Sequence, residues 1–295
     1  MTESRIRIAV QKSGRLSKPS LELLNRCGLK ADTYHRALLC PCEDFPADLL
    51  FVRDDDIPMY VNDGACDIGI VGLNEAIEKA PRSENRVKIL EHLGFGYCRL
   101  ALAVPEKDVA KNFSIKSLNG LKIASSYPVI LKQFLEKNSI IAEVVEMQGS
   151  VEIAPYMGIA DAICDLVSTG QTLKANKLRE VSTVLKSQAV VIGRSGEDDS
   201  GKLNIISKLL NRMLGVKNAA NAKYIMMNAP KSSLSKISAL IPGMEMPTVV
   251  PLCGSSEQVA IHAVAQEPIF WETMERLKEM GASSIIVSPI EKIIE

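Results

Sequence analysis

The feature that most constrains this chain is the regular alternation of short β-rich runs with amphipathic stretches. Most of the predicted strands are followed by a polar turn and then by a helical pattern. Strands that alternate with helices in this way are typical of parallel βαβ units. The predicted strands are 5–10, 48–53, 66–72, 99–104, 121–124, 142–147 and 162–167. Because the rhythm restarts near residue 100, the sequence predicts two α/β lobes.

The pattern changes from about residue 222. Strands are predicted at 224–227, 248–252, 259–264 and 284–287, with helices at 232–240 and 268–280. The order βαββαβ is that of a small ferredoxin-like domain. A chain of 295 residues is long enough for two domains of ~100–200 residues, or for three if one is small. We therefore predict that the carboxy-terminal part is a separate domain.

Composition and charge argue against several broad classes of protein. The 35 basic and 35 acidic side chains cancel, so the chain lacks the basic surface of a non-specific nucleic-acid or anionic-membrane binder. No apolar run approaches the ~20 residues of a membrane span, and the first residues do not resemble a secretory signal. The seven cysteines are scattered and odd in number, which is not typical of a disulfide framework. We expect a cytoplasmic protein that binds neither nucleic acid nor a membrane.

The most informative segment runs from Asp161 to Thr172. If 161–167 is extended, Asp161 and Asp165 lie on one face, which is unusual for an otherwise apolar strand. The turn that follows supplies three hydroxyl groups and a glycine ahead of a predicted helix. Hydroxyl groups and unpaired amides at the start of a helix form a site for an anion. The alternative is a buried strand with a Ser/Thr-rich cap.

Two further strand ends carry basic side chains, and a third carries an acid. Lys12 and Arg15 flank a Ser-Gly turn where a phosphate chain could lie, although a solvated basic turn is the simpler explanation. Arg53 precedes the aspartates 54–56, of which at least one is expected to cap the next helix or to hold the arginine. Glu152 could accept hydrogen bonds from sugar hydroxyls, or serve only the dipole of a predicted helix. Open α/β sheets bind ligands at strand ends of this kind.

These segments, in this order, resemble the long form of the ATP phosphoribosyltransferase family, which catalyses the first step of histidine biosynthesis. The matching stretches are QKSGRL (11–16), VRDDDIP (52–58), DIGIVG (67–72), SYP (126–128), GSVE (149–152), ADAICDLVSTG (160–170), KYIMM (223–227), FWETM (270–274), GASS (281–284) and PIEK (289–292). The resemblance therefore covers nearly the whole chain. Leu73 stands where the family commonly has an acid, and Tyr156 stands where it commonly has arginine.

The resemblance implies that N1 of ATP displaces pyrophosphate from phosphoribosyl pyrophosphate, giving N1-(5-phosphoribosyl)-ATP, with Mg²⁺ as cofactor. It implies that the sugar donor is bound by Asp165, Leu166, Val167, Ser168, Thr169, Gly170, Gln171 and Thr172. The residues implied to bind the phosphates of ATP or the leaving pyrophosphate are Lys12, Arg15 and Arg53. The implied catalytic residues are Arg53, Glu152 and Asp165, and the two carboxylates are candidates for holding Mg²⁺.

The fold implied by the resemblance is α/β, with two lobes like those of a periplasmic binding protein and a C-terminal ferredoxin-like regulatory domain. We expect residues 1–103 with 184–221 to form the first lobe, 104–183 the second lobe, and 222–295 the regulatory domain. The family implies L-histidine as a feedback inhibitor, and a homodimer that converts to a homohexamer. The alternative is a non-catalytic solute-binding or histidine-sensing protein with the same fold.

Overall fold

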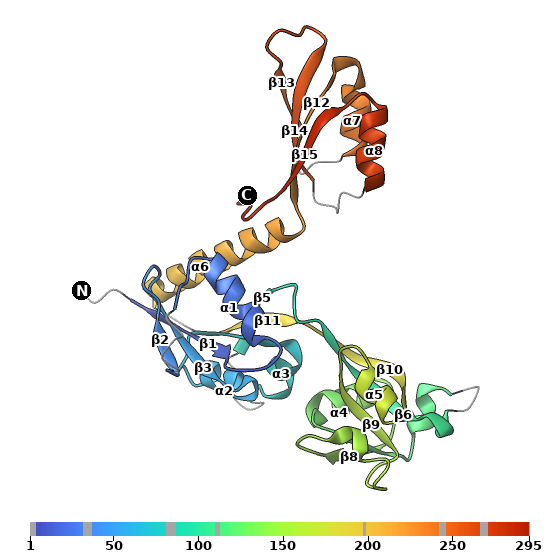
Figure 1. Ribbon diagram of the computed structural model, residues 1–295. Helices are drawn as coiled ribbons and strands as arrows, with labels where there is room; N and C mark the ends of the chain where they lie inside the picture. Colours follow the sequence, from blue (N-terminus) through green and yellow to red (C-terminus); the bar gives the residue numbers. More distant parts are fainter. Residues whose placement is uncertain are drawn as a thin grey trace. The chain divides into compact units, whose positions relative to one another are not determined.

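The computed structural model describes residues 4–31, 37–80, 87–109, 113–196, 199–241, 246–265 and 271–294. The chain forms two compact units, Met1–Ser207 and Lys208–Glu295. The described residues form three sheets, two in the first unit and one in the second (Figure 1). None of the described helices combines the length and the apolar character that crossing a membrane requires.

The first sheet is mixed and has the strand order β2-β3-β1-β4-β11-β5. Its strands are β1 (Ile6–Gln11), β2 (Leu39–Pro41), β3 (Ala47–Val52), β4 (Ile68–Gly72), β5 (Val87–His92) and β11 (Ala189–Arg194). β1 pairs in parallel with β3 and β4, whereas β11 runs antiparallel to β4 and β5. The helices α1 (Ser17–Arg26), α2 (Ile57–Asn62) and α3 (Leu73–Glu78) follow β1, β3 and β4 along the chain. The turns between these strands and helices therefore lie at one edge of the sheet.

The centre of the first sheet is built from branched apolar side chains. Ile8 and Val10 of β1 are fully buried, as expected for a central strand that is covered on both faces. Ile57 and Val61 of α2 pack in the same apolar cluster as residues of β4 and β11. A Cβ on Gly69 would lie 2.5 Å from Ile57 Cγ2, so glycine in β4 allows α2 to approach the sheet closely.

The second sheet has the strand order β10-β6-β9-β7-β8. Its strands are β6 (Cys98–Pro105), β7 (Lys122–Ser125), β8 (Glu143–Glu146), β9 (Ala162–Val167) and β10 (Leu178–Ser187). Its helices are α4 (Pro128–Lys137) and α5 (Gln171–Ala175), with 3₁₀ turns η2 (Glu106–Asp108), η3 (Ile115–Leu118) and η4 (Val151–Ile153). Cys164 of β9 packs with side chains of α4, whereas Ile163 and Val167 pack with Val151 and Leu173. Because side chains alternate along a strand, Asp165 lies on the side of η4 and α5.

The chain passes between the first two sheets twice. β5 and β11 belong to the first sheet, whereas β6 and β10 belong to the second. The two crossings are hydrogen-bonded to each other, from Leu93 N to Ala189 O at 2.9 Å and from Ala189 N to Phe95 O at 2.9 Å. The expected lobe edges at 103 and 184 differ from these boundaries by several residues, because β6 and β10 form one long antiparallel pair within the second sheet. We call the first sheet with its helices the first lobe, and the second sheet with its helices the second lobe.

The helix α6 (Ser200–Ala220) runs from the first unit into the second, where an antiparallel sheet follows it. The elements of this unit are β12 (Lys223–Pro230), η5 (Lys231–Ser233), α7 (Leu234–Leu240), β13 (Thr248–Pro251), β14 (Gln258–Ala265), α8 (Trp271–Glu279) and β15 (Ser283–Pro289). The strand order β13-β14-β12-β15 confirms the predicted ferredoxin-like arrangement. α7 and α8 cover one face of the sheet (Figure 1), where Ile237 and Leu277 pack with Ile225 and Ile261. The predicted start of the last helix at 268 lies outside the described residues.

Candidate functional site

The turn after β1 is folded over a buried glutamine. Gln11 Oε1 accepts a hydrogen bond from the Leu16 amide at 2.8 Å. Gly14 has a φ of +116°, and a Cβ there would lie 2.6 Å from Gln11 Nε2, so the turn requires glycine at this position. Lys12 and Arg15 are exposed, and neither pairs with a carboxylate within the described part of the chain. The two predicted cations are therefore available to an anion.

Arg53 follows β3 and is held by one of its acidic neighbours. Its Nε lies 3.2 Å from Asp55 Oδ1, and its Nη2 lies 3.3 Å from Asp55 Oδ2. The arginine side chain remains 79% exposed, so its other N–H groups can reach a ligand. The expected helix cap is not found, because neither η1 (Asp54–Asp56) nor α2 has a side-chain cap hydrogen bond. Asp55 thus orients Arg53, while Asp54 lines a cavity.

The charge of Glu152 acts on Asp165 beside β9. The Asp165 Oδ1 atom accepts a hydrogen bond from the Leu166 amide at 2.8 Å. Burial raises the pKa of Asp165, the Leu166 amide opposes that rise, and the negative charge of Glu152 adds to it. Glu152 lies in η4, which is one 3₁₀ turn where a longer helix is predicted. Pro155 lacks the amide hydrogen that a continuing helix would need.

Asp161 has a structural partner and stands apart from this pair. It precedes β9, and its Oδ2 accepts a hydrogen bond from the Lys122 amide at 2.8 Å. Its own amide donates to the Lys122 carbonyl, also at 2.8 Å. The bonds to Lys122 at the start of β7 account for this acid, so we do not assign it to an anion site.

The loop after β9 presents free hydroxyl groups. Gly170 has a φ of +80° and is the N-cap of α5. Among the described residues, the hydroxyls of Ser168 and Thr172 have no hydrogen-bond partner, and both residues are exposed. Arg99 of β6, which the sequence alone does not single out, braces this loop. Its Nη1 donates to the Ser168 carbonyl at 3.4 Å, while its Nε and Nη2 bind the Glu180 carboxylate at 2.8 and 2.6 Å.

A cavity of about 290 Å³ brings together three of the predicted segments. It is lined by Gln11, Arg15, Leu16, Asp54, Gly72, Asn74, Glu75, Leu166 and Ser168. Arg15 comes from the turn after β1, Asp54 from the turn after β3, and Ser168 from the loop after β9, so strand ends of both sheets contribute. The predicted site residues that do not line it are Lys12, Arg53, Glu152, Asp165, Val167, Thr169, Gly170, Gln171 and Thr172.

One side of this cavity is formed by a buried network of polar side chains that the sequence pattern does not predict. Tyr127 donates its hydroxyl to Glu75 Oε1 at 2.7 Å, and Asn74 Nδ2 donates to the same oxygen at 3.0 Å. The Ser187 hydroxyl donates to Asn74 Oδ1 at 2.8 Å. Burial raises the pKa of Glu75, and the hydrogen bond from Tyr127 opposes that rise. The sequence does contain a signal, because Asn74 and Glu75 closely follow the predicted strand at 66–72, as Lys12 follows the predicted strand at 5–10.

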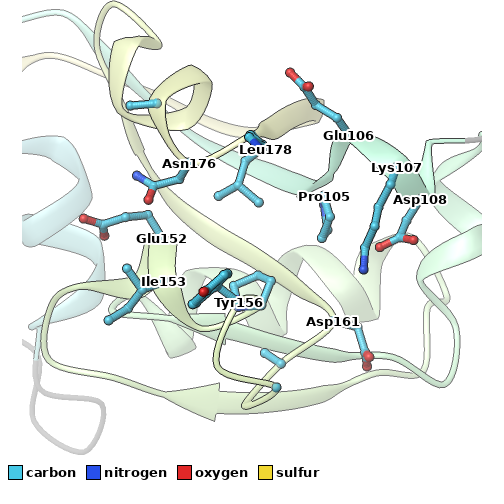
Figure 2. Close-up of a pocket in the computed structure, with 15 residues that line it drawn as sticks. Pro105, Glu106, Lys107, Asp108, Glu152, Ile153, Tyr156, Asp161, Asn176 and Leu178 are labelled. Carbon is cyan, nitrogen blue, oxygen red and sulfur yellow. The ribbon is translucent and has the colours of Figure 1, made fainter.

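A larger cavity, of about 780 Å³, lies within the second lobe (Figure 2). Its lining includes Glu152, Ile153 and Tyr156, together with Lys107 and Asp108 of η2. No residue of 168–172 lines it. We therefore take the smaller cavity as the centre of the candidate site, because it collects the predicted segments.

No group of three or more His, Cys, Asp or Glu side chains in the described ranges could hold a metal ion. Mg²⁺ usually keeps several waters and binds one or two protein carboxylates together with substrate phosphates. Glu152 and Asp165 supply two such carboxylates, and their mutual repulsion is the kind that a bound cation relieves. The donor chemistry of this pair therefore fits Mg²⁺.

Two family models match the sequence. Residues 53–215 match the ATP phosphoribosyltransferase family, and residues 219–292 match the C-terminal domain of that family. The ATP phosphoribosyl transferase (HisG:HisZ) complex from Thermotoga maritima matches at a TM-score of 0.57 and 23% identity, over 71% of this chain and 98% of that chain. The alkanesulfonate-binding protein SsuA from Xanthomonas axonopodis pv. citri matches at a TM-score of 0.47 and 15% identity, over 71% of each chain. The Thermotoga structure shares the fold of this chain over the matched 71%.

Proposed function

Because the chain belongs to the ATP phosphoribosyltransferase family, we propose that its substrates meet at the cavity of about 290 Å³. The enzyme transfers the phosphoribosyl group of phosphoribosyl pyrophosphate to N1 of ATP, in histidine biosynthesis. The observation that carries the proposed placement is that this cavity joins Arg15 and Asp54 to Ser168. A non-catalytic sensor is not favoured, because the family is one of transferases. The biosynthetic role supports the expectation that the protein is cytoplasmic.

The loop after β9 is the proposed site of the 5-phosphate of the sugar donor. The free hydroxyls of Ser168 and Thr172 are suitable donors for phosphate oxygens, and Arg99 fixes the loop through the Ser168 carbonyl. Glycine at 170 allows the left-handed turn that starts α5. The full set proposed for the sugar donor remains Asp165, Leu166, Val167, Ser168, Thr169, Gly170, Gln171 and Thr172.

The phosphates of ATP and the leaving pyrophosphate are proposed to bind at the ends of β1 and β3. Within the described ranges Lys12 and Arg15 have no ion-pair partner, so neither must give one up to meet a phosphate. Arg53 is exposed and oriented by Asp55, which suits an arginine that holds a leaving pyrophosphate.

Glu152 and Asp165 are the proposed protein ligands of Mg²⁺, and they are alternatively partners of the ribose hydroxyls. A bound divalent cation supplies neutralisation of the pyrophosphate charge. Cleavage at the sugar carbon passes through a cation-like state, so the protein acts mainly by aligning the substrates and balancing charge. Arg53, Glu152 and Asp165 are therefore proposed to act through position and charge rather than through a covalent intermediate.

The second unit is proposed to carry feedback inhibition by L-histidine. Residues 219–292 match the C-terminal domain of the family, and this unit has an apolar core of its own. We retain 222–295 as the regulatory domain, and we move the proposed lobe edges to the crossings at 93–97 and 188. The homodimer and homohexamer also remain proposals, and the Thermotoga structure is by its name a complex with a second protein.

The reaction can be followed by near-ultraviolet absorbance of the purified protein with ATP, phosphoribosyl pyrophosphate, Mg²⁺ and a pyrophosphatase. We expect the absorbance to rise as product forms, and we expect L-histidine to suppress that rise. We expect the double variant Ser168→Ala/Thr172→Ala to raise KM for phosphoribosyl pyrophosphate by about 10-fold and to leave KM for ATP unchanged, because each lost hydroxyl removes one hydrogen bond to phosphate. The exposed Thr248→Ala on β13 is the control.

Each outcome of these assays tests a different part of the proposal. A normal KM for the sugar donor in the double variant would reject the placement of the 5-phosphate but not the reaction. An absorbance rise that is the same with and without L-histidine would reject only the assignment of the second unit as a regulatory domain. Binding of both substrates without any rise would favour the non-catalytic alternative.

A further inference from the structure

Glu75 is a buried carboxylate to which the proposed substrate contacts give no role. It is 7% exposed and lines the cavity of about 290 Å³. Both of its hydrogen bonds, from Tyr127 and Asn74, end on Oε1. No described group donates a hydrogen bond to Oε2, and this oxygen is not fully buried. One oxygen is therefore fixed by the protein, and the other remains accessible from the cavity.

Glu78 shows what a wholly structural acid looks like on the same helix. It is also 7% exposed, and it does not line the cavity. Its Oε1 accepts a hydrogen bond from the Val129 amide at 2.9 Å, and its Oε2 accepts one from the Ile130 amide at 3.0 Å. Both oxygens of Glu78 thus serve the protein, whereas only one oxygen of Glu75 does. This contrast indicates that the second oxygen of Glu75 serves a ligand.

The charges around Glu75 define the chemistry of that ligand. Asp54 lines the same cavity, and burial together with the charges of Asp54 and Asp55 raises the pKa of Glu75. A phosphate placed directly against Oε2 would add negative charge beside a buried carboxylate, which is unfavourable, so the phosphates belong instead beside Arg15 and Ser168 of the same lining. A group that donates a hydrogen bond, and that becomes positive during the reaction, fits instead.

Adenine has such a group next to its reacting atom. As N1 attacks, its lone pair forms the bond to the sugar carbon, and the bond from that carbon to pyrophosphate breaks with its electron pair on the departing oxygen. The adenine ring gains one positive charge, which it shares with its 6-amino group. We propose that Glu75 is a catalytic residue whose Oε2 accepts a hydrogen bond from the 6-amino group of adenine and stabilises this positive charge. Tyr127 and Asn74 are its positioning residues.

This inference rests on the proposed meeting of the substrates at the same cavity. It adds the reason why the base must be an adenine. A carboxylate oxygen accepts a hydrogen bond from a 6-amino group but repels a 6-oxo group, so the site selects the amino form.

The test compares two nucleotides with matched variants. In Glu75→Gln, Tyr127 and Asn74 still require an acceptor at the Oε1 position, so the amide nitrogen takes the Oε2 position and faces the 6-amino group as a donor. We expect kcat/KM with ATP to fall about 100-fold, with KM for phosphoribosyl pyrophosphate unchanged. We expect calorimetric binding to lose its preference for ATP over purine riboside 5′-triphosphate, which lacks the 6-amino group. Glu78→Gln, on the same helix, should keep that preference.

An equal loss of affinity for both nucleotides in Glu75→Gln would overturn the inference. If this variant does not fold, Tyr127→Phe is the second test, because it removes one of the two donors that hold Oε1 and should also reduce the preference for ATP. An unchanged preference in Tyr127→Phe would count against the inference in the same way. Arg15→Ala distinguishes failure of the proposed substrate placement from failure of the role of Glu75. Unchanged ATP binding in Arg15→Ala would reject the placement. Weakened ATP binding in Arg15→Ala, together with an equal loss of affinity for both nucleotides in Glu75→Gln, would reject only the role of Glu75.

Discussion

At the scale of single residues, the candidate site depends on side chains that hold other side chains. Gln11 shapes the turn with the two free cations, Asp55 orients Arg53, and the Arg99–Glu180 pair braces the loop after β9. The hydrogen bond from Arg99 lowers the pKa of Glu180, burial opposes this, and the charge of Arg99 adds to it. The folded protein therefore favours the ionised form of Glu180 more than the unfolded chain does.

The sign of this shift gives a pH-dependent prediction. Glu180→Gln should lower the free energy of unfolding by about 1 kcal/mol at neutral pH, because it removes a bidentate charged pair. The stabilisation by Glu180 is present above the pKa of the unfolded chain and is lost as pH falls through the lower pKa of the folded protein. Urea unfolding from neutral to acid pH should therefore show the two proteins converging. A constant difference would contradict the prediction, and the exposed Glu143→Gln is the control.

At the scale of elements, α4 of the second lobe starts against a residue of the first lobe. Tyr127 is its N-cap and makes no side-chain cap bond. The first-turn amides of Val129 and Ile130 donate instead to Glu78 at the end of α3. A carboxylate at the start of a helix also interacts favourably with the helix dipole. One acid thus ends the helix of one lobe and caps the helix of the other.

We expect Glu78→Ala to lower the free energy of unfolding by about 2 kcal/mol, because two amides of α4 lose a charged acceptor. Urea denaturation followed by circular dichroism measures this loss. Lys79→Ala is a matched control, since Lys79 is the next residue and is exposed. Equal stability of the two variants would show that α4 does not depend on the carboxylate.

The sequence predicts much of the apolar framework, but it misses β11, a buried apolar strand of the first sheet, and it predicts the polar partners poorly. The strand predicted over 162–167 coincides with β9, because its apolar run is buried on both faces. β10 is not predicted, because its partly exposed residues show no regular period and its pairing with β6 shifts register twice. Tyr127 and Glu75 lie 52 positions apart, and Arg99 and Glu180 lie 81 apart, so the pattern in one segment cannot indicate the other.

At the scale of the whole molecule, the sole tryptophan gives a probe that belongs to one unit. Trp271 is the first residue of α8 in the second unit and is 78% exposed. We expect saturating L-histidine to change its fluorescence, because the proposed inhibitor site lies in the same unit. ATP, proposed to bind in the first unit, should change it much less. An unchanged spectrum with histidine, in protein whose activity histidine inhibits, would contradict this prediction.

The two hydrogen-bonded crossings between the first two sheets also affect how a chain of this kind can change in evolution. The chain leaves the first sheet at Leu93 and returns at Ala189, and the backbone N and O atoms of these residues lie 2.9 Å apart. The second lobe is therefore one continuous segment of the chain whose two ends are already neighbours. All strands of the first sheet, in the order β2-β3-β1-β4-β11-β5, lie outside this segment. The loop proposed to hold the sugar donor thus lies in a segment that can diverge as one block, constrained by the contacts that Tyr127 and the start of α4 make with Glu75 and Glu78 of the first lobe.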